Sequence, residues 1–213
     1  MRRNPIRVVF VGDSITASTR DMNKDDDLGG GYPKHVAEIL ENRYGKENFF
    51  FRNRGIWGNE TKDLLSRLKT DVLDFGPDII VLFIGVNDTL RHAETGDLPM
   101  DVFQSQYARI IDMIKEQTTA KILVIEPYLL MEDFYNRAKK RFDLIARIDV
   151  IRRTVKGRVD GYLPLDGLFA SLYVTDDAEG RTADGLHPNA SGAQFIGEHC
   201  AAYLLPIVES LFE

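Results

Sequence analysis

Apolar residues along the chain occur in two alternating patterns. Short, nearly continuous runs rich in β-branched and aromatic residues cover positions 6–11, 49–51, 78–84, 121–126 and 159–165. Such runs predict buried β-strands. Between them, apolar residues recur every three or four positions over 32–44, 60–73, 102–117, 134–156 and 190–205. That spacing predicts amphipathic α-helices.

The order of these segments predicts the fold class. The run at 78–84 is apolar on both faces of the expected strand, which is typical of a parallel sheet covered by helices on both sides. Strands separated by helices imply right-handed βαβ units. We therefore expect an α/β protein, a three-layer α/β/α sandwich of the flavodoxin-like kind with about five parallel strands. The sequence has no internal repeat or linker, so residues 1–213 are expected to form one domain.

Composition and charge exclude several classes of protein. The net charge is −6, without the overall excess of basic residues that is typical of a nucleic-acid-binding protein. Cys200 is the only cysteine, which excludes an internal disulfide and a cysteine-based zinc site, and its helical setting predicts a small buried hydrophobe. The first apolar run ends at Gly12, too early for a signal peptide. The longest later run, 79–86, is shorter than the ~18 residues of a membrane span. A cytoplasmic location and no membrane span are expected.

Unusual residues follow several of the predicted strands. Ligand sites in open parallel sheets lie beyond the carboxyl ends of the strands. Each segment found there, taken alone, is ordinary turn or helix-capping chemistry. The segments are Gly12-Asp13-Ser14 after the first strand, 53–61 with Gly55 and Gly58 after the second, Gly85-Val86-Asn87-Asp88 after the third, and Asp184-Gly185-Leu186-His187 near the carboxyl terminus.

Together these segments hold the groups that acyl transfer requires. The reaction needs a hydroxyl nucleophile, an imidazole base, a carboxylate that orients the imidazole, and donors for the developing oxyanion. Ser14 is expected to open a helix, where free N–H groups favour negative charge. His187 follows Asp184 by three residues, so one loop can present both. Two of the other three histidines, His35 and His199, fall inside predicted helices.

The four ordered segments resemble the blocks of the SGNH (GDSL-type) hydrolase family. The resemblance extends from residue 6 to about residue 200. It implies that Ser14 is the nucleophile and that Asp184 and His187 complete a catalytic triad. It also implies an oxyanion hole formed by the N–H groups of Ser14 and Gly58 and by the side-chain amide of Asn87. The chain has no Gly-x-Ser-x-Gly sequence, which argues against the α/β-hydrolase fold.

The implied activity is that of a serine esterase that needs no metal and no organic cofactor. Two acidic residues beside the site, Asp13 and Asp88, are expected to cap turns rather than to take part in the chemistry. Trp57, the only tryptophan, stands next to Gly58. We expect it to bind substrate, either by stacking on a sugar or by walling the pocket.

The sequence indicates the substrate less clearly than it indicates the reaction. The stretch Gly29-Gly30-Gly31-Tyr32, the Asn-x-Gly-x-x-Gly-Asn block and the chain length look most like an intracellular branch similar to acetylxylan and acetyl-xylooligosaccharide esterases. This implies an O-deacetylase for a small-molecule or oligosaccharide ester, with assembly into a homo-oligomer. A second branch with similar motifs comprises lysophospholipases and acyl thioesterases. A non-catalytic binding module on the same fold also remains open at this point.

Overall fold

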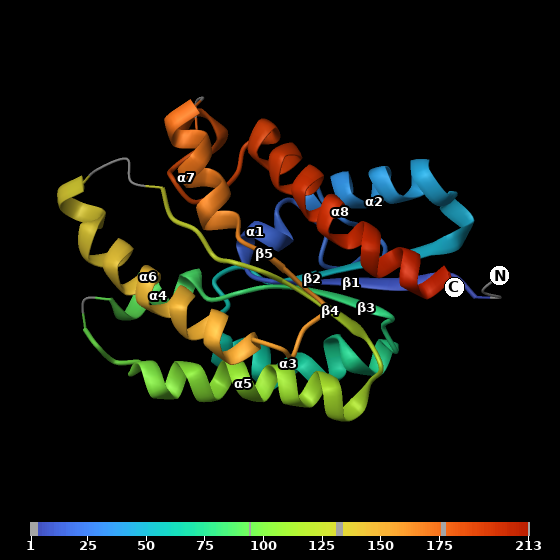
Figure 1. Ribbon diagram of the computed structural model, residues 1–213, viewed down its shortest axis with the longest axis horizontal. Helices are drawn as coiled ribbons and strands as arrows, with labels where there is room; N and C mark the ends of the chain where they lie inside the picture. Colours follow the sequence, from blue (N-terminus) through green and yellow to red (C-terminus); the bar gives the residue numbers. More distant parts are fainter. Residues whose placement is uncertain (1–3, 94, 131–133, 176–177, 213) are drawn as a thin grey trace.

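The computed structural model describes residues 4–93, 95–130, 134–175 and 178–212 (Figure 1). Five parallel strands form one sheet in the order β2-β1-β3-β4-β5. The strands are β1 (Ile6–Gly12), β2 (Phe49–Gly55), β3 (Ile79–Phe83), β4 (Lys121–Ile125) and β5 (Gly161–Leu163). The α-helices are α1 (Ser14–Ala17), α2 (Tyr32–Tyr44), α3 (Thr61–Asp71), α4 (Val86–His92), α5 (Met100–Gln117), α6 (Phe134–Val155), α7 (Leu165–Thr175) and α8 (Ala190–Phe212). Single 3-10 turns lie at Lys46–Asn48, Leu73–Phe75 and Glu179–Arg181.

Helices cover both faces of the sheet. Helices α2, α7 and α8 lie on one face, and α3, α5 and α6 lie on the other (Figure 1). Side chains of a strand point alternately to the two faces. In β1, Val8 and Phe10 accordingly pack in the cluster that includes α2 and α8, whereas Val9 and Val11 pack in the cluster that includes α3 and α5. The predicted three-layer α/β/α sandwich with five parallel strands is confirmed.

Several element boundaries differ from the sequence-based expectation. Strand β2 continues to Gly55 instead of ending at residue 51. The polar residues 52–54 predict a loop from the sequence. They fit a strand here because β2 lies at the edge of the sheet, where Arg52 and Arg54 both pair with the Asp25 carboxylate. Helix α8 continues to Phe212, beyond the expected end at residue 205. Pro206 lies within α8, and the residues that follow it remain helical with buried side chains at Ile207 and Val208.

Helix α8 also meets the length and hydropathy requirements of a membrane span. It is the one helix in the described ranges that does so. The expectation of no span considered only uninterrupted apolar runs and overlooked this helix. Ile196, Cys200 and Leu204 are buried in the core beside the sheet, so the composition of α8 equally suits a core helix of a globular protein. The burial of Cys200 agrees with its predicted role as a small hydrophobe.

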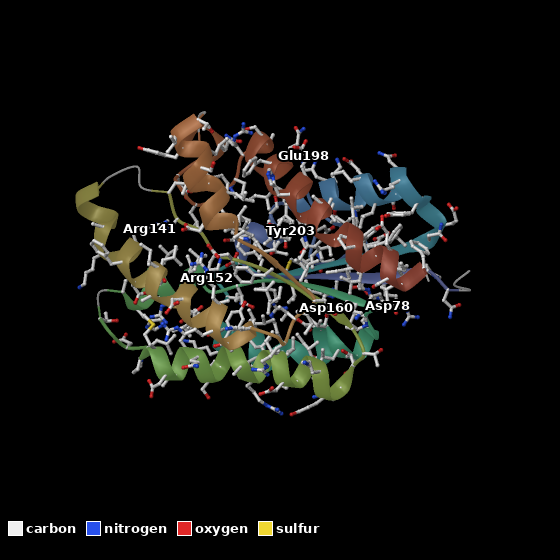
Figure 2. The ribbon with its side chains drawn as sticks, viewed as in Figure 1. Asp78, Arg141, Arg152, Asp160, Glu198 and Tyr203 are labelled. Carbon is white, nitrogen blue, oxygen red and sulfur yellow. The ribbon has the colours of Figure 1, made fainter. Side chains whose placement is uncertain are left out.

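Polar side chains at the amino ends of the strands have structural partners. Asp78 precedes β3, and its carboxylate accepts a hydrogen bond from the backbone N–H of Arg7. Asp160 precedes β5, and its carboxylate accepts one from the backbone N–H of Ile122 and pairs with Lys121 (Figure 2). The segments singled out by the sequence lie at the opposite, carboxyl ends of the strands.

Candidate active site

The site lies where the strand order reverses. Strand β1 has β2 on one side and β3 on the other, so the chain segments that follow β1 and β3 diverge and leave a crevice. The ends of β1 and β3 approach closely, because a Cβ atom at Gly12 would lie 2.1 Å from the carbonyl oxygen of Phe83. Only glycine fits there. Asp13 then caps α1 by accepting a hydrogen bond from the backbone N–H of Ile15 at 2.9 Å, and Ser14 begins that helix.

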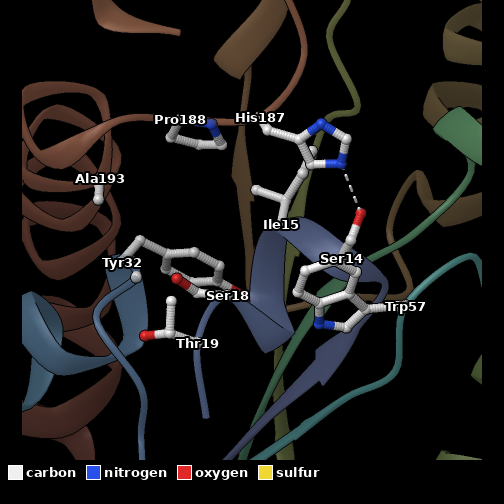
Figure 3. A pocket seen from close by; sticks show the side chains of 10 residues that line it. Ser14, Ile15, Ser18, Thr19, Tyr32, Trp57, His187, Pro188 and Ala193 are labelled. Atoms are coloured by element: carbon white, nitrogen blue, oxygen red, sulfur yellow. Dashed lines mark hydrogen bonds between the residues drawn. The ribbon is translucent and has the colours of Figure 1, made fainter. Parts of the chain in front are cut away.

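Ser14, His187 and Asp184 form one hydrogen-bonded chain. Ser14 Oγ lies 3.0 Å from His187 Nε2 (Figure 3), and His187 Nδ1 lies 2.8 Å from Asp184 Oδ2. The other carboxylate oxygen of Asp184 accepts the backbone N–H groups of Leu186 at 3.0 Å and His187 at 2.7 Å. The structure thus brings together the three residues that the sequence selected as a triad.

The electrostatics of this chain favour an ionised Asp184. Partial burial alone would raise the pKa of its carboxyl group, but the hydrogen bonds from the His187 backbone and ring and from Leu186 outweigh burial and lower the pKa below its usual value. Ser14 is buried, whereas the side chains of His187 and Asp184 are about half exposed. A carboxylate that stays ionised can orient the imidazole and stabilise it when it is protonated.

Residues after β4 hold the loop that carries His187. The Tyr128 hydroxyl donates to the carbonyl oxygen of Leu186 at 2.6 Å, and the Leu130 backbone N–H donates to the carbonyl oxygen of Gly185 at 2.8 Å. Tyr128 is fully buried, and its ring stacks on Phe169 with 4.3 Å between ring centroids. From the sequence, nothing separated Tyr128 from an ordinary packing residue, because its partner is a backbone carbonyl 58 positions away.

The two other expected oxyanion donors lie on neighbouring elements. Gly58 has a φ of +73° in the turn after β2, and Asn87 lies in the first turn of α4. The Asn87 side-chain amide donates to the carbonyl oxygen of Asn59 at 3.1 Å, and the Arg91 guanidinium donates to that of Gly58 at 3.2 Å. Within the described ranges, the backbone N–H groups of Ser14 and Gly58 have no hydrogen-bond partner.

The two nearby carboxylates cap backbone, as predicted. Asp88 accepts the backbone N–H and the hydroxyl of Thr61, the latter at 2.6 Å. Burial raises the pKa of Asp88 to about 6 in spite of these hydrogen bonds. Burial also raises the pKa of Asp13 to about 7, with its Oδ2 atom buried and without a hydrogen-bond partner among the described residues. Both carboxyl groups therefore favour the neutral form more than an exposed aspartate does.

The sequence did not anticipate the role of His92. It lies at the end of α4, and its Nε2 atom is 2.5 Å from Oε2 of the buried Glu60. Glu60 in turn is the N-cap of α3 in a reciprocal capping box with Asp63. His92 thus connects the end of α4 to the start of α3. The pairing links residues 32 positions apart, so no local pattern could have revealed it.

A cavity of about 350 Å³ adjoins Ser14 and His187 (Figure 3). Ile15, Tyr32, Pro188 and Ala193 contribute mostly apolar walls. Trp57 also lines the cavity and is 68% exposed, which places it at the mouth. The predicted position of Trp57 beside the site is therefore observed.

The described part of the chain contains no group of three or more His, Cys, Asp or Glu side chains arranged to hold a metal ion. The groups described above for acyl transfer are the side chains of Ser14, His187 and Asp184 and the hydrogen-bond donors beside them.

Comparisons with known proteins bear on the family and the fold of the chain. The sequence model of the GDSL-like Lipase/Acylhydrolase family matches residues 10–195. An acetylxylan esterase from Geobacillus stearothermophilus is 26% identical over 202 residues, which cover 89% of this chain and 90% of the relative. A solved structure of an acetylxylan esterase from the same species has a TM-score of 0.82 at 20% identity, covering 96% of this chain and 97% of the other. One from Parabacteroides merdae, named as a GDSL-like lipase, has a TM-score of 0.85 at 24% identity, covering 92% and 94%. These structural likenesses establish the fold.

Proposed function

Because the chain belongs to the GDSL-like lipase/acylhydrolase family and is a carboxylic ester hydrolase, we propose that it hydrolyses acetyl and other short-chain esters of carbohydrates through Ser14, His187 and Asp184. The observation that carries the proposal is the continuous hydrogen-bonded chain from Ser14 Oγ to the Asp184 carboxylate, with its serine end at a cavity. The membership in a family of hydrolases makes a non-catalytic binding module the weaker interpretation.

Acylation begins with proton transfer from Ser14 to His187. As Nε2 of the imidazole takes the hydroxyl proton, Ser14 Oγ forms a bond to the ester carbonyl carbon, and the carbonyl oxygen becomes an oxyanion. Asp184 stabilises the resulting imidazolium, and its hydrogen bond with Nδ1 keeps the ring oriented with Nε2 toward Ser14. The carbon–oxygen bond to the alcohol then breaks, and the alcohol oxygen takes the proton from Nε2.

The oxyanion is stabilised by three donors in this proposal. The backbone N–H groups of Ser14 and Gly58 are unengaged in the described part of the protein. The Asn87 amide has two N–H donors, of which one binds the Asn59 carbonyl and holds the side chain in place. Donors fixed before the reaction stabilise developing charge without a cost of reorganisation.

Deacylation repeats the same steps with water as the nucleophile. His187 accepts a proton from water, whose oxygen attacks the acyl carbon of the Ser14 ester. The bond from Ser14 Oγ to that carbon breaks, Ser14 Oγ recovers its proton from Nε2, and a carboxylic acid is released. The protein returns to its starting state, and no other reactant is needed.

Two observations support a carbohydrate as the alcohol. Trp57 presents an exposed indole ring at the cavity mouth, and such rings stack well on the apolar faces of sugars. The relative that is 26% identical over most of the chain is an acetylxylan esterase. On this basis we extend the proposal to O-acetyl groups on a xylose-based or similar oligosaccharide.

A panel of nitrophenyl esters tests the acyl preference. We expect kcat/KM to peak at acyl chains of two to four carbons, with a gradual decline beyond, because each extra methylene changes binding by only ~1–3 kcal/mol. A maximum at eight carbons or longer would instead support the lysophospholipase or acyl-thioesterase alternative.

Labelling with a fluorophosphonate tests the nucleophile. The probe phosphonylates an activated serine, and we expect peptide mapping to find the label on Ser14. Ser14→Ala and His187→Ala should both abolish labelling, whereas the wild-type protein should lose esterase activity in proportion to the label. An unlabelled Ser14 in an active protein would disprove the assignment.

A further inference from the structure

We infer that the 350 Å³ cavity beside Ser14 receives the alcohol half of the ester and selects neutral, ring-shaped alcohols. This inference rests on the proposed function, because it takes Ser14 as the nucleophile and His187 as the proton donor. It goes further by assigning the alcohol half of the substrate to one part of the site, the cavity, and the carbonyl oxygen to another.

The position of His187 sets that direction. The imidazole must return its proton to the leaving oxygen, so this oxygen has to lie within hydrogen-bond reach of Nε2. The Ser14–His187 pair forms one wall of the cavity, and Pro188 continues that wall from His187 (Figure 3). Of the three proposed oxyanion donors, Ser14 lies at the edge between the two halves of the substrate, and Gly58 and Asn87 are not among the residues that line the cavity. An alcohol attached to the leaving oxygen therefore extends into the cavity, while the carbonyl oxygen points away from it.

The size of the cavity argues for the same assignment. An acetyl group would leave most of the 350 Å³ empty, and atoms that line an unfilled space lose their dispersion contacts. Small-molecule sites begin at roughly 300 Å³. The cavity is thus of a size that suits a ring-shaped alcohol and is poorly matched to the methyl group of acetate.

The lining of the cavity favours a neutral occupant. Its walls are largely apolar, and hydroxyl groups of Ser18 and Thr19 contribute the polar part on one side (Figure 3). The Thr19 hydroxyl accepts the backbone N–H of Gly30 and keeps its own proton for donation. No Lys, Arg, Asp or Glu occurs among the described residues that line it. A phosphate or carboxylate placed there would lose its hydration without gaining a charged partner.

Ala193 is the specificity-determining residue that this assignment singles out. It lies in the first turns of α8, is 3% exposed and lines the cavity opposite the Ser14–His187 pair (Figure 3). Leucine at this position adds three carbons to the wall and suits a helix. Ala202, an exposed residue of the same helix outside this cavity, provides the matched control.

The experiment varies the alcohol and the acyl group independently. Wild type, Ala193→Leu and Ala202→Leu are assayed with nitrophenyl acetate, propionate and butyrate, and with ethyl acetate as the small-alcohol substrate. We expect Ala193→Leu to lower kcat/KM for nitrophenyl acetate about tenfold or more while ethyl acetate changes less than about twofold. The loss should be the same for all three acyl chains, and Ala202→Leu should match wild type.

A second variant and a charged substrate complete the test. Trp57→Ala removes an exposed ring from the mouth and should also weaken the nitrophenyl esters more than ethyl acetate, which keeps the inference testable if Ala193→Leu does not fold. The neutral methyl ester of 4-acetoxybenzoate should be preferred about tenfold or more over the anionic acid, after division by their spontaneous hydrolysis rates. Equal rates for the two would refute the selection of neutral alcohols.

The outcomes separate this inference from the proposed function. If the Ala193→Leu defect grows with acyl length and appears equally with ethyl acetate, the cavity holds the acyl group and the inference is wrong, although Ser14-dependent turnover remains. If wild type hydrolyses no ester in the panel, or Ser14→Ala retains turnover, the proposed function fails and the inference fails with it.

Discussion

Replacing Asp13 with Asn should make the stability of the protein less dependent on pH. Asp13 is fully buried, and burial raises its pKa from 3.8 to about 7, with the nearby Asp88 charge acting in the same direction and His187 in the opposite one. The folded protein therefore holds a proton on Asp13 at pH values where the unfolded chain has lost it.

The sign and size of the effect follow from this difference. A raised carboxyl pKa contributes its full stability below the unfolded value of 3.8, and that contribution is lost as the pH rises toward about 7. The total is roughly 4 kcal/mol as an upper estimate, from about three pKa units at 1.36 kcal/mol each. Between about pH 5 and about pH 8, the loss should be roughly 2.5 kcal/mol.

Urea denaturation at several pH values measures this contribution. Asn at position 13 keeps an oxygen to accept the Ile15 N–H but has no titrating proton. The unfolding free energy of wild type should therefore fall more steeply with pH than that of Asp13→Asn, and contributions from groups that do not interact with Asp13 should cancel in the difference. Parallel curves for the two proteins would show that Asp13 titrates normally and that the argument from burial is wrong.

Three further substitutions give distinct expectations. Asn87→Ala should lower kcat by about 10²–10³ with little change in KM, because it removes one proposed oxyanion donor. Steady-state kinetics measures this effect, and an unchanged circular dichroism spectrum shows that the variant is folded. Wild-type kcat in that variant would contradict the placement of the oxyanion hole. Tyr128→Phe keeps the ring but leaves the Leu186 carbonyl unpaired, which costs about 1–3 kcal/mol of unfolding free energy. Because this carbonyl helps to hold the His187 loop, kcat should fall roughly tenfold and the acid limb of the pH–rate profile should shift. A loss of stability alone would leave that limb in place. Cys200→Ala should retain full activity and lose about 1 kcal/mol of unfolding free energy, and inactivity of the folded variant would reveal a role for the thiol.

The sequence predicted the sheet well because its signal is local. The apolar runs of β1, β3 and β4 are buried on both faces, and their position in the chain is fixed by glycine and proline at their ends. The apolar helix α7 was missed, since exposed apolar residues such as Tyr173 and Val174 obscure the helical spacing of its buried positions. The short α4 was also missed, because it is only a few residues long and follows a turn, whereas the helix expected to begin at Ser14 is observed as α1.

The site was predictable only as far as its motifs are contiguous. Ser14, Asp184 and His187 stand in short motifs, and the structure places them within hydrogen-bond distance of one another. The contacts that hold them, such as Tyr128 to Leu186, join distant segments through backbone atoms and have no sequence signature. The cytoplasmic location, the homo-oligomer and the extent of the domain stay predictions from the sequence.

The most direct test of the central claim is to trap the acyl-enzyme. Wild-type protein is mixed with nitrophenyl acetate, quenched in acid within the first turnovers and digested for mass spectrometry. We predict one added acetyl group on the peptide that contains Ser14, formed together with a burst of nitrophenol and absent from Ser14→Ala and His187→Ala. Rapid turnover with the acetyl group on another residue, or undiminished turnover by Ser14→Ala, would contradict the account.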